Sequence, residues 1–183
     1  MKLIAPMFLV IACACALQAQ NADALVKDLH QSYMGIKGTL TAAAEAMPES
    51  DYDFKLTPAQ RTFGGWVAHV AEAQMRTCAG INGSGKKSDA GSKTSKADLV
   101  AALKASFDEC DTAYEGTTAA NYLSGVRSFR GETPRLASLY GNLAHDQECY
   151  GNMVGYLRSK NIVPPSTKRM EEMMKRRGAG EKH

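Results

Sequence analysis

The chain has 183 residues, of which 44% are hydrophobic and 22% are charged, and its formal net charge is +3. This length allows one domain with a substantial hydrophobic core. The weak positive charge, without a basic and aromatic stripe or the spacing of a helix-turn-helix or zinc finger, argues against a nucleic-acid partner.

The first 20 residues have the pattern of a secretory signal peptide. Lys2 precedes an apolar run, Leu3 to Ala16, and small residues follow it. This run is too short for a stable membrane span, so we expect an exported protein, either periplasmic or secreted. A second interpretation stays open, because residues 10–13 (VIAC) resemble a bacterial lipobox and would leave a lipid anchor on Cys13.

Apolar residues recur at helical spacing in four later segments. The first spans residues 22–47 and ends before Pro48, because a proline pushes the preceding residue out of the helical conformation. The second is predicted over residues 58–80, with Thr57, Pro58 and Gln60 as its start signal. The third is predicted over 96–115, after a linker rich in Gly, Ser and Lys at 80–95.

The fourth segment is expected to begin at Glu132-Thr133-Pro134, after an irregular stretch at 116–131, and to end before Pro164-Pro165. A basic tail, residues 166–183, follows. We expect a short packed helix in this tail and disorder in its last residues. The pattern therefore predicts an all-α domain over residues 21–165.

His145 and Cys149 are four residues apart and share one face of the fourth predicted helix. Imidazole and thiolate at this spacing can hold one transition metal. The face around them carries small and neutral polar residues, with Asp146 and Glu148 at its flanks, and we interpret it as the wall of a cleft. A solvated helix with an incidental histidine is the alternative.

Two regions of the sequence resemble the DinB family. The first contains HDQECYGN at 145–152, YLR at 156–158 and VPPS at 163–166; the second contains YDFK at 52–55, TP at 57–58, RTF at 61–63 and WVAHV at 66–70. The resemblance covers most of the chain after residue 22. It implies a four-helix bundle in which a long crossover leaves the second and third helices parallel.

The resemblance also implies a metal site built from three histidines. The first two match His69 and His145, and the third falls at Cys149. Three protein ligands leave positions open for a substrate, and this donor set suits zinc best, with nickel as a second possibility. Trp66, Glu148 and Tyr156 match neighbouring positions that can line the pocket or support the ligands.

The family includes proteins similar to thiol transferases and to metal-dependent hydrolases. The resemblance therefore implies an unidentified small-molecule substrate, and it is compatible with a homodimer. Cys149 leaves another interpretation open, because it can mark a site that no longer binds metal. The protein would then be a noncatalytic binding or stress-related scaffold.

Three cysteines remain beyond the signal segment: Cys78, Cys110 and Cys149. If the second and third helices are parallel, as the resemblance implies, Cys78 and Cys110 lie at the same level near the ends of these helices. This placement predicts a disulfide between them, which an oxidising compartment would preserve. Two buried free thiols are the alternative.

Overall fold

The computed structural model describes residues 4–128 and 131–180, and the side chains of residues 20–128 and 131–178. Its long helices are α1 (Ile4–Ala46), α2 (Phe63–Asn82), α3 (Lys96–Glu115) and α4 (Arg135–Ser159), followed by α5 (Pro165–Gly180). Two short 3-10 helices, η1 (Glu49–Asp51) and η2 (Ala90–Ser92), and two strands, β1 (Gly125–Ser128) and β2 (Gly131–Pro134), connect them.

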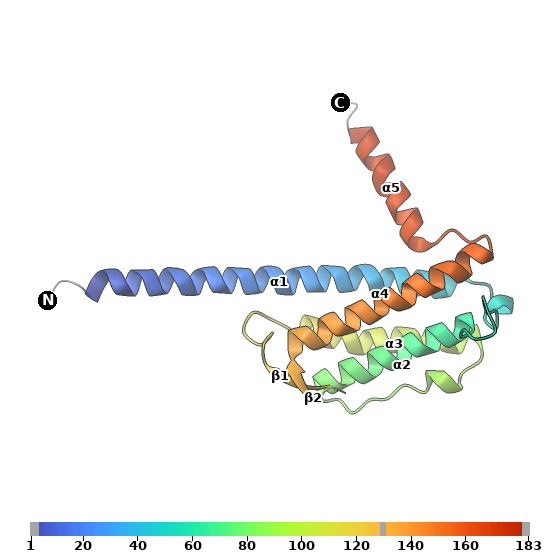
Figure 1. Cartoon of the computed structure of the whole chain (residues 1–183), viewed down its shortest axis with the longest axis horizontal. Coiled ribbons are helices and arrows are strands. Elements are labelled where there is room, and N and C mark those ends of the chain that lie inside the picture. The colour runs from blue at the N-terminus through green and yellow to red at the C-terminus, as the bar shows by residue number, and fades with distance from the viewer. Residues whose placement is uncertain (1–3, 129–130, 181–183) are drawn as a thin grey trace.

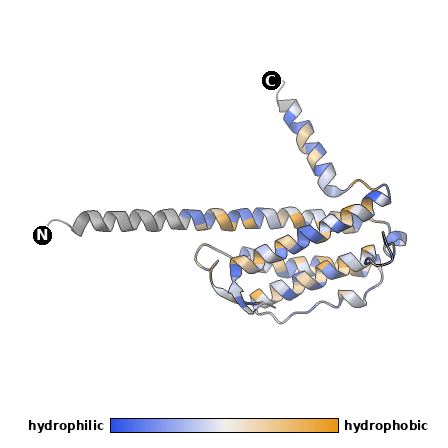
Figure 2. Cartoon of the chain, viewed as in Figure 1, coloured by the Kyte–Doolittle hydropathy of each residue, from blue (hydrophilic) through white to orange (hydrophobic). Residues whose placement is uncertain are grey.

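The first four helices form the bundle that the resemblance implies. Figure 1 shows α2, α3 and α4 packed beside the C-terminal half of α1, whose N-terminal part extends beyond them. Each helix contributes a fully buried aromatic ring to the core: Tyr33, Phe63, Phe107 and Tyr156. In Figure 2 apolar and polar residues are interspersed along the coloured parts of these helices, as expected for helices that bury one apolar face.

The helices α2 and α3 lie side by side and run in the same direction. Gly64, near the start of α2, lies against Leu99, near the start of α3. Near the other ends, a disulfide joins Cys78 to Cys110, and their Cα atoms are 4.9 Å apart. The predicted crossover is therefore present, and the linker between α2 and α3 runs back along the bundle (Figure 1).

Helix α2 begins later than predicted. Its first residue is Phe63, and Thr62 caps it, because the Thr62 hydroxyl accepts a 2.9 Å hydrogen bond from the Gly65 N–H. Thr57, the predicted cap, instead accepts through its carbonyl from the Gln60 N–H in a turn. The helix starts at Phe63 and not at Pro58 because the cap at Thr62 is combined with complete burial of the Phe63 side chain in the core.

The predicted irregular stretch at 116–131 ends in a β-hairpin that the sequence analysis missed. Strands β1 and β2 are antiparallel, with Gly125 opposite Pro134 and Ser128 opposite Gly131. Helix α4 therefore starts at Arg135 and not at Glu132. The hairpin forms here because Val126 turns inward and is buried beside the bundle end.

The C-terminal tail forms a longer and more exposed helix than expected. The hydroxyl of Tyr150 donates to Ser166 Oγ at 2.8 Å and holds the start of α5. Beyond this point Met170, Met173 and Met174 are exposed, and α5 projects away from the bundle (Figure 1). Helix α5 does not pack along the bundle because its three methionines form only a narrow apolar edge among charged residues. The predicted disorder of the last residues concerns 181–183, which lie outside the described residues.

In the described part of the chain, no helix has both the length and the apolar character needed to cross a membrane.

Removing the disulfide should destabilise the bundle. It bridges residues 32 positions apart, and a cross-link of this length contributes about 3 kcal/mol by restricting the unfolded chain. Chemical denaturation of a Cys78→Ala/Cys110→Ala variant should show this loss in the free energy of unfolding. Cys149→Ala should leave the effect of a reducing agent unchanged. Identical unfolding of the oxidised and reduced wild-type protein would contradict the prediction.

Candidate metal centre

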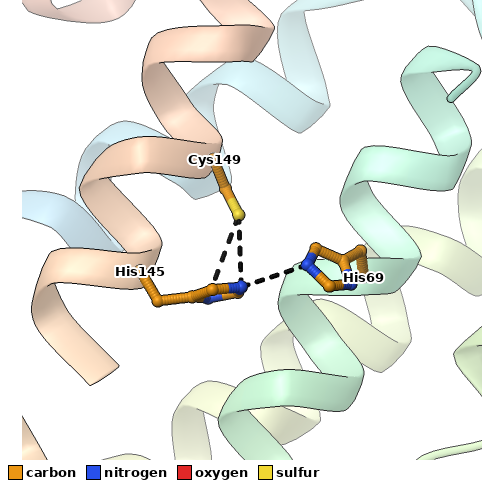
Figure 3. Close-up of side chains that lie close together, drawn as sticks. All are labelled: His69, His145 and Cys149. Atoms are coloured by element: carbon orange, nitrogen blue, oxygen red, sulfur yellow. Dashed lines mark hydrogen bonds between the residues drawn. The ribbon is translucent and has the colours of Figure 1, made fainter. Parts of the chain in front are cut away.

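Three potential metal donors converge between α2 and α4. His69 extends from α2, and His145 and Cys149 extend from successive turns of α4 toward it (Figure 3). The two histidine Nε2 atoms are 3.0 Å apart, and Cys149 Sγ is 3.6 Å from His145 Nε2. One donor atom from each residue can be chosen so that all three lie within 4.8 Å of one another.

These distances fit a small divalent metal. In a tetrahedral zinc site, two imidazole nitrogens are about 3.3 Å apart, and a nitrogen and a thiolate sulfur about 3.6 Å apart. The His69–His145 and His145–Cys149 separations are close to these values. The residues present therefore fit a metal, with a modest inward rotation of His69 and Cys149 toward each other.

The centre is sheltered on one side and open on the other. Cys149 is only 2% exposed, whereas the His145 side chain is 31% exposed. Burial shields the thiol from solvent, and the partial exposure of His145 leaves one side of the cluster accessible to solvent. Asn142 and Tyr156, which the helical spacing places on the same face as His145, are buried in the helix packing.

Asp146 lies deeper in the bundle than the helical pattern predicts. The pattern places it at the flank of the helix face, but its side chain is fully buried. Its Oδ1 atom lies 3.8 Å from His145 Nδ1 and has no hydrogen-bond partner among the described residues. Its Oδ2 atom accepts from the Asn142 amide at 3.3 Å. Because His145 Nε2 faces His69, the Asp146 carboxylate can orient the imidazole from behind.

The two histidines have opposite electrostatic surroundings. The Asp146 carboxylate, and after it the Cys149 sulfur, raise the pKa of His145 to about 10. Burial, and after it the positive charge of Arg61, lower the pKa of His69. Burial raises the pKa of Asp146 to about 6. One protonated and one neutral imidazole can therefore share the short hydrogen bond between their Nε2 atoms.

The three supporting residues predicted from the sequence occupy different environments. The Trp66 ring lies 6.0 Å from that of His69, and the guanidinium of Arg61 lies over the Trp66 ring, 5.2 Å from its centroid. Tyr156 is buried, and its hydroxyl donates to the Arg61 carbonyl at 2.6 Å. Glu148 is exposed on the outer side of α4. Trp66 therefore borders the centre, and Tyr156 ties α4 to the segment before α2.

The fold and the cluster define a class: an all-α bundle with a candidate metal site between its second and fourth helices. The model of the DinB superfamily matches residues 37–151, more than half of the chain, and the protein belongs to this superfamily. No curated protein sequence matches the chain.

Two solved structures share this fold. A DinB-like protein from Bacillus cereus is 14% identical, with a TM-score of 0.64 over 76% of this chain and 95% of its own. A DinB-like protein from Bacillus subtilis is 15% identical, with a TM-score of 0.62 over 74% of this chain and 94% of its own. At these identities the likeness concerns the bundle alone.

Replacing Asp146 with Asn should weaken metal binding about 10- to 100-fold, because the amide no longer supplies a charged acceptor for His145 Nδ1–H. Zinc affinity, measured by chelator competition, tests this. Glu148→Gln is the matched control, because it removes an exposed carboxylate from the same helix and should leave affinity unchanged. Equal losses in both variants would refute a specific role for Asp146.

Metal affinity should increase with pH. Below its raised pKa of about 10, His145 carries a proton that a metal must displace. Each pH unit between about pH 6 and pH 8 should therefore strengthen binding about tenfold. Chelator competition at several pH values measures the slope, and an affinity independent of pH would contradict the proton displacement.

Proposed function

We propose that this protein is an exported metal-dependent enzyme that acts on a small molecule, as a hydrolase or a thiol-group transferase. The convergence of His69, His145 and Cys149, with donor atoms within 4.8 Å of one another, is the observation that carries the proposal. Three protein donors, one of them partly exposed, suit a site that accepts a substrate, whereas a purely structural site is normally closed by four.

Each residue of the cluster would have a distinct role. His69 and His145 would present neutral imidazole nitrogens, and Cys149 a thiolate sulfur, a donor set that favours zinc over harder metals. Asp146 would hold the Nδ1–H of His145 and fix the orientation of its ring. Zinc bound there would supply Lewis-acid chemistry toward a water molecule or a substrate thiol. Trp66 would shield the centre from bulk water on the α2 side.

Export is part of the proposal. The disulfide between Cys78 and Cys110 supports it, because such bonds persist mainly in oxidising compartments. The pattern of residues 1–20 points the same way.

Metal content tests the proposal directly. After purification with zinc, the wild-type protein should retain stoichiometric metal, and His69→Ala should lose it because only two donors remain. His30→Ala is the matched control, since His30 lies on α1 outside the cluster, and it should bind zinc normally. Elemental analysis measures the content, and thermal unfolding of each variant verifies the fold.

Activity then separates the two reaction types. Zinc-loaded wild-type protein should either transfer a small thiol to an electrophile or hydrolyse an ester or amide, and His69→Ala should lose that activity. Absence of metal at saturating supply, with equal melting of all variants, would overturn the proposal. It would instead favour the noncatalytic scaffold, with Cys149 marking a lost site.

A further inference from the structure

A groove of about 660 Å³ lies beside the C-terminal half of α2. One wall is the face of α2 that carries Glu72, Arg76 and Gly80, and the opposite wall is the returning linker at 83–88. Arg127 of β1 also lines the groove. The groove therefore forms where three segments meet that are distant in sequence, and the linker and strand can be followed in Figure 1.

The linker that forms the outer wall is held in place. Gly83 and Gly85 have φ angles of 66° and 68°, which favour glycine and let the chain reverse direction after α2. Further along, Ala90 is completely buried, and the Gly91 N–H donates to Glu72 Oε1 at 2.9 Å. Because the fold fixes both ends of this segment, it also fixes the position of the outer wall of the groove.

Positive charge dominates the groove. Arg76, Lys86, Lys87 and Arg127 line it, against the single carboxylate of Glu72. Lys86 is neutralised by Glu109, with 2.7 Å between Nζ and Oε2. The other three cations have no ion pair among the described residues. An anionic ligand would therefore meet unpaired guanidinium groups, which bind carboxylate and phosphate through two parallel hydrogen bonds.

The end of α2 does not oppose an anion here. A free helix C-terminus carries partial negative charge on its last carbonyls. At this end the Ala79 carbonyl accepts from the N–H groups of both Gly83 and Ser84. This capping satisfies the carbonyl of Ala79, which lines the groove, and so reduces the negative potential that an anion would meet there.

The groove lies on the same side of α2 as the candidate metal centre. Arg76 follows His69 by seven residues, which is two helical turns and about 10 Å along the axis. Glu72 stands between them, held by Gly91. One extended small molecule could therefore occupy both places.

From this juxtaposition we infer that the groove binds the anionic end of the substrate whose reactive end lies at His69, His145 and Cys149. The substrate class is an elongated small molecule with a carboxylate or phosphate about 10 Å, or two helical turns, from its reactive group. This inference rests on the proposed function, and Arg76 and Arg127 are its specificity-determining residues.

Thiols of graded length test the inference. The cobalt-loaded protein is titrated with ω-mercaptooctanoate, with the uncharged ω-mercaptooctanol, and with ω-mercaptoheptyl phosphate. Binding is followed through the increase in the thiolate-to-cobalt absorption band above the contribution of Cys149. The two anionic thiols should bind about tenfold more tightly than the alcohol, because they add charge-assisted hydrogen bonds. The tighter of the two identifies the preferred group. Mercaptopropionate, which is too short to reach the groove, should show no advantage over mercaptopropanol.

Arginine variants test whether the affinity advantage of the anionic thiols comes from the groove. Arg76→Gln/Arg127→Gln should abolish the advantage of the anionic thiols and leave binding of the alcohol unchanged. Arg158→Gln, an exposed arginine on α4, should retain the full advantage. Thermal unfolding establishes that each variant is folded.

The outcomes also separate this inference from the proposed function. Failure to bind cobalt would overturn both. If cobalt binds normally but the anionic and uncharged thiols bind with equal affinity, the groove assignment alone is overturned. The same holds if cobalt binds normally and neither kind of thiol binds. An advantage that survives in the Arg76→Gln/Arg127→Gln variant would also overturn it.

Discussion

The position of α2 between α3 and α4 is the constraint on which the rest of the structure depends. One side of α2 packs against α3, where the disulfide from Cys78 to Cys110 fixes the relative level of the two helices. Another side faces α4 and places the Nε2 atom of His69 3.0 Å from the Nε2 atom of His145. Because one rigid helix carries both contacts, the fixed core packing also fixes the geometry of the candidate metal centre.

The crossover linker has a structural role and a role in forming the groove. Parallel packing of α2 and α3 requires a long connection, since the chain must return along the whole bundle. In this protein the connection is bound to α2 through Glu72 and Gly91 and buries Ala90. It therefore adds a cationic wall beside the helix that carries His69. The need to connect parallel helices thus produces a surface that a short loop would not provide.

Burial distinguishes the candidate centre from a surface pair of histidines. Cys149 and Asp146 are both excluded from solvent, whereas His145 remains partly open. A buried carboxylate is costly unless it is paired, and Asp146 has Asn142 on one oxygen and His145 near the other. Packing therefore holds a charged group behind an imidazole that a metal would use through its other nitrogen.

Sequence periodicity predicts the four bundle helices. The third has the predicted bounds, because helical propensity and the apolar stripe agree there, whereas α1 begins at Ile4 and not at residue 22. The spacing of His145 and Cys149 and the resemblance around His69 also identify the cluster. Only the tertiary structure decided that α2 starts at Phe63, that residues 125–128 pair with residues 131–134 as antiparallel strands, and that Asp146 is buried. These features depend on contacts between segments distant in sequence, which local patterns do not encode. The groove between α2, the linker and Arg127 arises in the same way.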